Sequence, residues 1–154
     1  EVQPQNTEER RKETLKENII IAERGNYGKV KYLAAVPQFN LSDEEFNLVA
    51  QVVQAEAGGE PYEGQVAVAN VIFNRLKAGW GRTVTEVITQ KGQFTKVRKK
   101  PSASVKEAVK EALYGKNAVP EGTLFFQNLD ISKDFTIPRS KKYVTKIGRH
   151  TFYR

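Results

Sequence analysis

Residues 62–77 constrain the fold most, because they read as a helix that is apolar on nearly every side. Pro61 suits the first turn of such a helix, and Glu60 and Glu63 suit its positive end. A helix without a polar face has to be buried, so we expect this one at the centre of the domain. Its apolar residues are Val66, Val68, Ala69, Val71, Ile72, Phe73 and Leu76.

A second helix is expected directly before it, over residues 43–57. Ser42 and Glu45 have the spacing of a capping box, and Gly58-Gly59 resembles the left-handed stop that often ends a helix. Glu56 therefore lies at the corner between the two helices. Apolar neighbours desolvate a carboxyl group and raise its pKa. Glu56 is thus either a proton donor near neutral pH or a solvated residue on the polar side of its helix, and spacing alone leaves both readings open.

The rest of the chain predicts two further helices and a small sheet. Thr83 can cap a short helix that runs through Ile88, and Ser102 can cap an amphipathic helix that ends at Gly115. Helices followed by an antiparallel sheet near the C-terminus indicate a mainly helical α+β domain. The strands are expected at residues 123–127, 143–147 and 151–153, the last two pairing across Gly148.

Two parts of the chain are expected to differ in role. Residues 41–154 form the α+β domain, and residues 1–40 form an N-terminal helical arm or linker. The chain has no methionine, so we interpret it as a processed or truncated form of a secreted precursor. No apolar run approaches the ~20 residues of a membrane span.

The composition removes most kinds of catalytic site. The chain has no cysteine, and His150 is its only histidine, which excludes thiol catalysis and the usual zinc sites. Neither a Gly-x-Ser-x-Gly elbow nor a glycine-rich phosphate loop occurs. We therefore expect no metal and no cofactor, and we interpret His150 as a hydrogen-bonded structural residue. A carboxyl group remains as the acid-base catalyst, as in polysaccharide cleavage.

The net charge of +7 favours an anionic partner. The densest run of basic residues in the chain is Lys96, Arg98, Lys99 and Lys100. Such a run is either a solvated loop or a binding surface for a polyanion, such as nucleic acid, anionic lipid or bacterial wall polymers. No nucleic-acid-binding motif accompanies it, so we expect no nucleic-acid partner.

One long run and three shorter segments carry a family resemblance. Residues 55–75 read AEAGGEPYEGQVAVANVIFNR, and residues 93–95, 124–128 and 147–153 follow with QFT, LFFQN and IGRHTFY. In this order they resemble the SleB-type cell wall hydrolases, which include the spore-cortex-lytic enzymes of spore-forming bacteria. The resemblance covers residues 41–154, and residues 1–40 resemble no family that we can name.

The resemblance implies a lysozyme-like fold with a peptidoglycan-binding groove. It implies cleavage between N-acetylmuramic acid and N-acetylglucosamine, by the lytic transglycosylase route, with Glu56 as acid and base. The partners implied are peptidoglycan glycan strands and the anionic wall surface, outside the cytoplasm, in the cell wall or the spore cortex. The residues expected to bind substrate are Gln93, Phe94, Thr95, Phe126 and Asn128.

Other activities stay open at this point. Some members of the family are described as amidases that cleave N-acetylmuramoyl-L-alanine, and the domain could also bind the wall without cleaving it. Two departures affect the groove. The family usually has arginine at the position of Gly58, and often Tyr-Asn-Pro where this chain has Gln127-Asn128-Leu129. We expect the first to remove a salt bridge beside Glu60 and the second to alter one wall.

Overall fold

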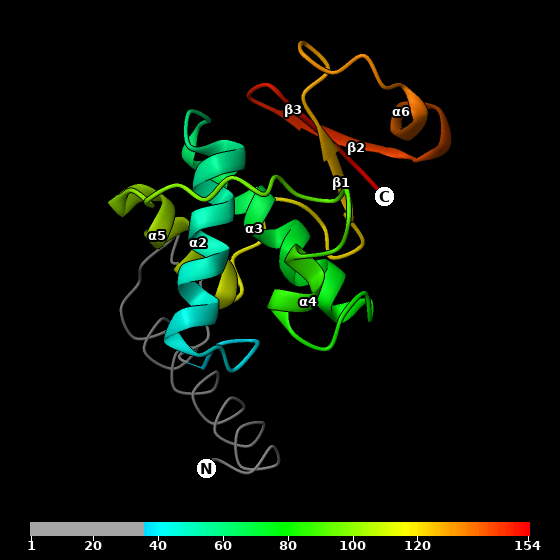
Figure 1. Ribbon diagram of the computed structural model, residues 1–154. Helices are drawn as coiled ribbons and strands as arrows, with labels where there is room; N and C mark the ends of the chain where they lie inside the picture. Colours follow the sequence, from blue (N-terminus) through cyan, green and yellow to red (C-terminus); the bar gives the residue numbers. More distant parts are fainter. Residues whose placement is uncertain (1–35) are drawn as a thin grey trace, which may run out of the picture.

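The computed structural model describes residues 36–154 (Figure 1). Most of the predicted N-terminal arm over residues 1–40 therefore lies outside the described residues. The last residues of that segment contact the helical body, because Gln38 N–H donates to the carbonyl of Leu113 and Phe39 stacks on Phe73 at 5.8 Å.

Helix α3, Tyr62–Lys77, lies at the centre of the domain, as its apolar surface predicted. Every residue from Gly64 to Arg75 is buried. Helices α2 (Asp43–Ala57), α4 (Val84–Ile88) and α5 (Ala103–Leu113) pack against it (Figure 1). The bounds predicted for α2 and α3 are confirmed. The start of α2 is well marked because Ser42 and Glu45 form the expected capping box, each side chain accepting from the other's backbone N–H at 3.1 Å.

The predicted left-handed stop at the end of α2 is wrong. Gly58 has φ −59° and ψ −31°, so the chain stays right-handed there and Gly58 N–H donates to the carbonyl of Gln54. The position is instead marked by close packing. A Cβ atom at this position would lie 2.5 Å from the Gln54 carbonyl oxygen, so a larger residue here would require the corner to shift.

Three buried polar side chains on α3 hold the irregular segment that leads to the sheet. Asn70 donates to the carbonyl of Lys116 and accepts from Ala118 N–H, both at 2.8 Å. Asn74 donates to the carbonyl of Thr123 at 3.0 Å, and Arg75 Nε donates to that of Leu124 at 2.8 Å. The segment over residues 116–124 is thus fixed by hydrogen bonds from the central helix.

The sheet has three antiparallel strands in the order β1-β3-β2. They are β1 (Phe125–Gln127), β2 (Tyr143–Ile147) and β3 (His150–Tyr153), which confirms the predicted mainly helical α+β class. In Figure 1 the sheet lies at one end of the helical body. β1 begins two residues later than predicted, because Thr123 N–H donates to the carbonyl of Pro120 in a turn. Helix α6 (Thr136–Ser140) was not predicted, since it is one short turn without a buried residue.

We predict that Gly148→Ala destabilises the domain more than Gly79→Ala. Both glycines have positive φ, +58° and +81°, where alanine costs about 1 kcal/mol. Only at Gly148 would the new Cβ also meet neighbours, among them Pro61 Cδ at 2.8 Å. We expect a loss of about 2–4 kcal/mol at Gly148 and about 1 kcal/mol at Gly79, measured by urea unfolding. Equal losses would contradict the close packing of the hairpin on Pro61.

Candidate active site

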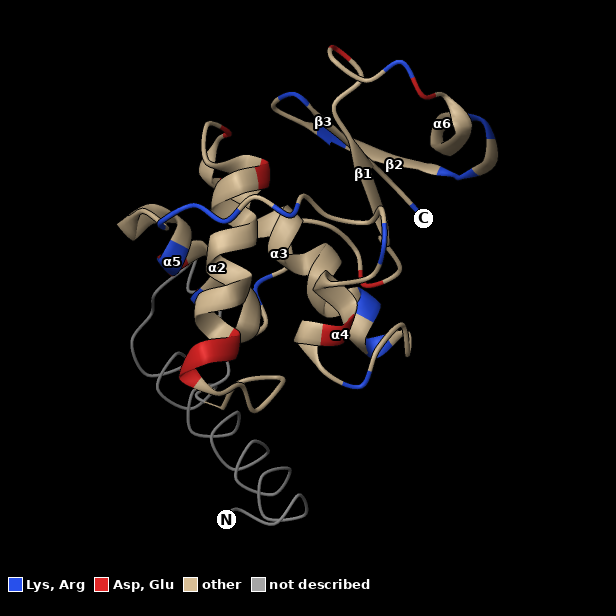
Figure 2. Cartoon of the chain, in the orientation of Figure 1, with Lys and Arg blue, Asp and Glu red and all other residues tan. Residues whose placement is uncertain are grey.

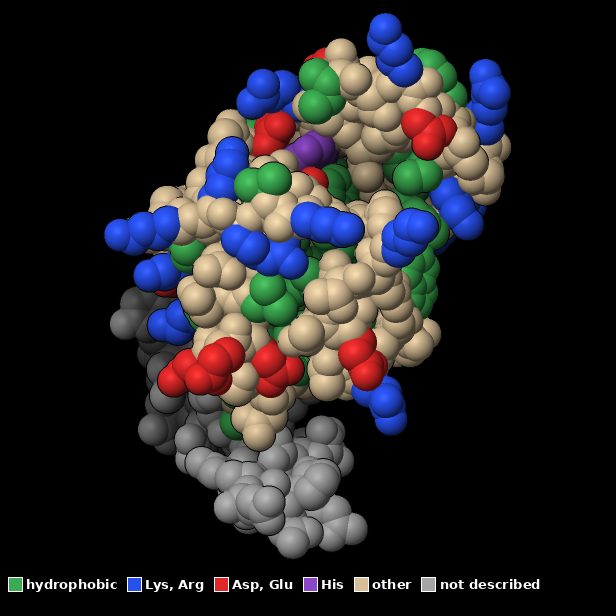
Figure 3. Space-filling model, viewed as in Figure 1, with side chains coloured by type: hydrophobic (Ala, Val, Ile, Leu, Met, Phe, Trp, Pro, Cys, Tyr) green, Lys and Arg blue, Asp and Glu red, His purple; other side chains and the backbone are tan. Residues whose placement is uncertain are grey.

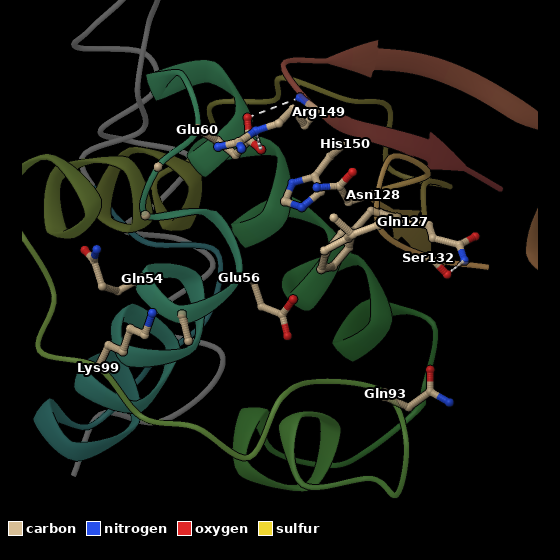
Figure 4. A pocket seen from close by; sticks show the side chains of 15 residues that line it. Gln54, Glu56, Glu60, Gln93, Lys99, Gln127, Asn128, Ser132, Arg149 and His150 are labelled. Atoms are coloured by element: carbon tan, nitrogen blue, oxygen red, sulfur yellow. Dashed lines mark hydrogen bonds and ion pairs between the residues drawn. The ribbon is translucent and has the colours of Figure 1, made fainter. Parts of the chain in front are cut away.

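A cavity of about 490 Å³ opens between the α2–α3 corner and the sheet (Figures 3 and 4). Its helical side includes Glu56, Gly59 and Glu60, and its sheet side includes Phe126 and His150. In Figure 3 the purple imidazole marks one edge of the hollow. The remaining lining residues are Gln54, Ala55, Gly58, Gln93, Lys99, Gln127, Asn128, Ile131, Ser132 and Arg149.

Glu56 presents its carboxyl group to this cavity from the last turn of α2 (Figure 4). The side chain is half-buried, and its Oε1 accepts a hydrogen bond of 2.7 Å from Thr95 N–H. Burial raises the pKa of Glu56, while the Thr95 hydrogen bond and the positive charge of Arg75 oppose that rise. Glu56 can therefore hold a proton at higher pH than an exposed glutamate, as a general acid must.

Arg75 supplies a buried positive charge on the side of α3. Its guanidinium carbon lies 4.5 Å from the ring centroid of Trp80 and 4.8 Å from that of Phe94. Its Nη1 is buried without a hydrogen-bond partner in the described part of the chain. Burial lowers the pKa of Arg75 to about 10, and the charge of Glu56 counteracts this. The guanidinium thus stays charged near neutral pH and acts on Glu56 through space.

A contact between Glu60 and Arg149 joins the two sides of the cavity. Glu60 Oε1 lies 3.3 Å from Arg149 Nε, and its Oε2 accepts from Arg149 N–H at 3.2 Å. The Glu60 side chain is 6% exposed, whereas that of Arg149 is 62% exposed. Glu60 was predicted as a helix-start residue with a salt bridge missing beside it, but Arg149 pairs with it and Glu60 holds the β2–β3 hairpin against the corner. Glu63 does lie in the first turn of α3.

The residues expected to bind substrate fall into two groups. Gln93, Phe126 and Asn128 line the cavity. Phe94 and Thr95 are not among the lining residues. Phe94 is buried, with its ring 6.2 Å from that of Phe126 and beside Arg75. Thr95 instead contacts Glu56 through its backbone. The structure thus places these two behind the cavity wall and in the support of Glu56.

The interpretation of His150 as a fully hydrogen-bonded residue is wrong. Its Nδ1 is buried and has no partner among residues 36–154. The ring lines the cavity and makes edge contacts with Phe126 at 5.1 Å and Phe152 at 6.3 Å. Burial lowers the pKa of His150, so the ring is neutral near neutral pH. The sequence alone did not reveal this. Phe126 lies in β1 and Phe152 lies two residues further along β3, so the surroundings of the ring depend on how the strands pair.

Among the residues of the site that were not predicted are Gln54, Arg75 and Arg149, whereas Lys99 belongs to the basic run identified in the sequence. Arg75 had a detectable signal, since it is a charged residue in a helix that is otherwise apolar on nearly every side. Gln54 and Arg149 carry no comparable signal, because nothing in their spacing distinguishes them.

The acids of the cavity support single-carboxylate chemistry. Among the lining residues only Glu56 and Glu60 are acidic, and Glu60 is engaged by Arg149. Within residues 36–154, no cluster of three or more histidine, cysteine, aspartate or glutamate side chains could hold a metal ion.

We predict that Glu56→Gln stabilises the folded domain at neutral pH. The folded state binds the Glu56 proton more tightly than the unfolded chain does, because burial raises the folded-state pKa. Stability is therefore lost as pH rises from the unfolded value of about 4.3 through the raised folded value. Glutamine removes this loss and can still accept from Thr95. Urea unfolding should show a gain at about pH 7 that disappears at about pH 3, and a gain independent of pH would contradict the assignment.

Comparison with known proteins agrees with this geometry. The model of the cell wall hydrolase family matches residues 59–153. The chain is 39% identical over 124 residues to a spore cortex-lytic enzyme of Oceanobacillus iheyensis, covering 76% of this chain and 44% of the relative. The corresponding enzyme of Bacillus subtilis is 35% identical over 117 residues, 72% of this chain and 38% of the relative. The chain thus spans less than half the length of these curated relatives.

Two solved structures share the fold. One is the catalytic domain of the germination-specific lytic transglycosylase SleB from Bacillus anthracis, with a TM-score of 0.69 and 33% identity. The match covers 77% of this chain and 100% of that one. The other is the catalytic domain of the Bacillus cereus SleB protein, with a TM-score of 0.67, 33% identity, and coverage of 75% and 93%. A cavity with one available carboxyl group, the family match and the shared fold agree: the chain belongs to the cell wall hydrolase family.

Proposed function

We propose that this domain cleaves the glycosidic bond between N-acetylmuramic acid and N-acetylglucosamine in peptidoglycan, as a lytic transglycosylase. The observation that carries the proposal is the cavity in which Glu56 is the only acid not already engaged by a cation. The related SleB catalytic domain is described as a lytic transglycosylase, which supports the same reaction class. We place the substrate in the cell wall or spore cortex, outside the cytoplasm.

Glu56 supplies both proton transfers in the proposed reaction. Its raised pKa lets the protonated carboxyl group donate to the glycosidic oxygen as the bond to the anomeric carbon breaks. The resulting carboxylate then accepts the proton of the 6-hydroxyl group on the same muramic acid residue. That oxygen attacks the anomeric carbon and closes a 1,6-anhydro ring. No water is consumed and Glu56 ends protonated, ready for the next cycle.

The surroundings of Glu56 match these two roles. Burial favours the protonated acid, while the Thr95 N–H and the charge of Arg75 favour the carboxylate formed after donation. Glycosidases with two catalytic carboxylates hold them about 5–9.5 Å apart. The second carboxylate either activates a water molecule or is itself the nucleophile. Here Glu60 is neutralised by Arg149, which favours attack by the substrate's own hydroxyl group.

The basic run suits the anionic wall. Lys96, Arg98, Lys99 and Lys100 are exposed on the loop between α4 and α5, where Figure 2 shows successive blue segments. None of them forms a salt bridge with an acid among the described residues, and Lys99 lines the cavity. We propose that this loop contacts acidic groups of the wall. No described helix is long and apolar enough to cross a membrane.

The direct test is analysis of the muropeptides released from purified sacculi and spore cortex. We expect products with 1,6-anhydro ends, identified by mass spectrometry, and a loss of about 10²–10⁴-fold in kcat for Glu56→Gln. Glu63→Gln is the matched control, because Glu63 is exposed in the first turn of α3 and outside the cavity. New reducing ends would indicate a muramidase, and new peptide amino termini an amidase. Absence of cleavage would leave a wall-binding module.

We also predict that Arg75→Met raises the pKa of Glu56 further. The positive charge of Arg75 favours the carboxylate, so its removal should favour the protonated acid. The alkaline limb of the pH–activity profile should then move to higher pH, as should the titration of Glu56 followed by NMR. Arg75→Lys keeps the charge and should leave the titration closer to wild type, although both variants lose the hydrogen bond to Leu124. Equal titrations in both variants would contradict the through-space effect.

A further inference from the structure

We propose that His150 and Asn128 form a pair of N–H donors that binds an amide carbonyl of the substrate beside Glu56. The acetamido group of an N-acetylated sugar carries such a carbonyl. The inference rests on the proposed function for its substrate class. It assigns a specificity role to two side chains on the sheet side of the cavity, opposite Glu56.

The ring of His150 has a fixed orientation. His150 begins β3, and its imidazole lies edge-on to Phe126 and Phe152. With 5% of its surface exposed, the residue has little freedom to rotate. Nδ1 is fully buried while the ring lines the cavity, so Nε2 is the nitrogen left to face the cavity.

The buried nitrogen also determines which nitrogen carries the proton. A neutral imidazole has one N–H donor and one acceptor nitrogen. Burial keeps this ring neutral near neutral pH. Nδ1 has no partner among the described residues, and buried unpaired N–H groups are rarer than buried unpaired acceptors. The proton therefore belongs on Nε2, where it is a donor directed at the cavity.

Asn128 supplies the second donor. The antiparallel register pairs Gln127 with Thr151, so Asn128 at the end of β1 comes opposite His150 at the start of β3. Its Oδ1 already accepts from Asp130 N–H at 3.0 Å, which leaves the Nδ2 amino group to donate. Both residues line the cavity, and Figure 4 shows them together on the sheet side.

The chemistry of this pair selects its ligand. Two neutral donors suit a neutral acceptor with two lone pairs, which describes an amide carbonyl. A carboxylate would call for a cation beside the pair, but the adjacent Arg149 is already paired with Glu60. Lys99 also lines the cavity, but it lies beside Gln54, away from the pair (Figure 4). Sugar hydroxyl groups can both donate and accept, so donors alone do not distinguish them. An acetamido group is therefore the substrate feature that this pair recognises best.

The test compares N-acetylated peptidoglycan strands with the same strands after chemical N-deacetylation. Wild type should cleave the acetylated strands at least tenfold faster in kcat/KM. His150→Phe keeps an aromatic ring but no donor, and should lose about tenfold on acetylated strands, the value of one hydrogen bond, with little change on deacetylated strands. His150→Gln places an amide nitrogen near the position of Nε2 and should recover most of the loss.

Asn128→Asp provides an independent variant with nearly the same shape. Aspartate keeps the oxygen that accepts from Asp130 N–H but replaces the donor by an acceptor. It should lose the preference for acetylated strands and gain relative activity on the deacetylated strands, whose ammonium groups it can bind. Calorimetry can measure strand binding without turnover when Asn128→Asp is combined with Glu56→Gln. Compared with Glu56→Gln alone, the double variant should show the same change of preference between the two strands.

Two kinds of failure can be told apart. If wild type cleaves neither strand, the proposed function fails. If wild type cleaves both strands and the His150→Phe and Asn128→Asp variants, folded by circular dichroism, lose activity equally on both, the donor pair has no part in amide recognition. If the two variants lose activity only on the acetylated strands, the result supports amide recognition by His150 and Asn128.

Discussion

The fold depends on the burial of α3 from Gly64 to Arg75, and on the hydrogen bonds that its polar side chains make there. A helix surrounded by protein cannot leave Asn70, Asn74 and Arg75 without partners, because an unpaired buried polar group costs about 1–3 kcal/mol. Their partners are backbone groups of the segment over residues 116–124. That segment leads directly into β1, so the central helix determines where the sheet begins and, through the sheet, where Phe126 and Asn128 stand in the cavity.

The same helix connects the fold to the chemistry. Arg75 holds the chain at Leu124 with one nitrogen and contacts the rings of Trp80 and Phe94 with its face. The residue after Phe94 donates its backbone N–H to Glu56. Arg75 therefore both supports the segments around Glu56 and favours its carboxylate through its positive charge. This gives a reason for a charged residue in the buried part of α3, whose other polar side chains are uncharged.

The helices could be predicted from the sequence because their ends are local. Ser42 and Ser102 cap within three residues, and an amphipathic or all-apolar stripe needs no knowledge of distant contacts. Glu56 also stood out, as a carboxyl group at a corner between two such helices. The sheet was harder, because the start of β1 depends on hydrogen bonds to α3, and α6 has no buried face to create a periodic pattern.

The finer parts of the site could not be predicted, for a physical reason. Phe94 lies in a loop, and only the packing of the sheet on the helices turns its ring towards Arg75 and not into the cavity. The unpaired Nδ1 of His150 likewise results from its position between two aromatic rings. Local spacing contains no information about such neighbours.

The contact between Glu60 and the hairpin has a consequence for how this family can diversify. One of its two bonds comes from the backbone N–H of Arg149, and any residue except proline supplies that group. Substitution at position 149 can therefore change the charge at the cavity mouth while the hairpin keeps its attachment to the corner. The attachment of the hairpin and the charge beside the cavity thus depend on different atoms of one residue, so evolution can adjust the second without losing the first.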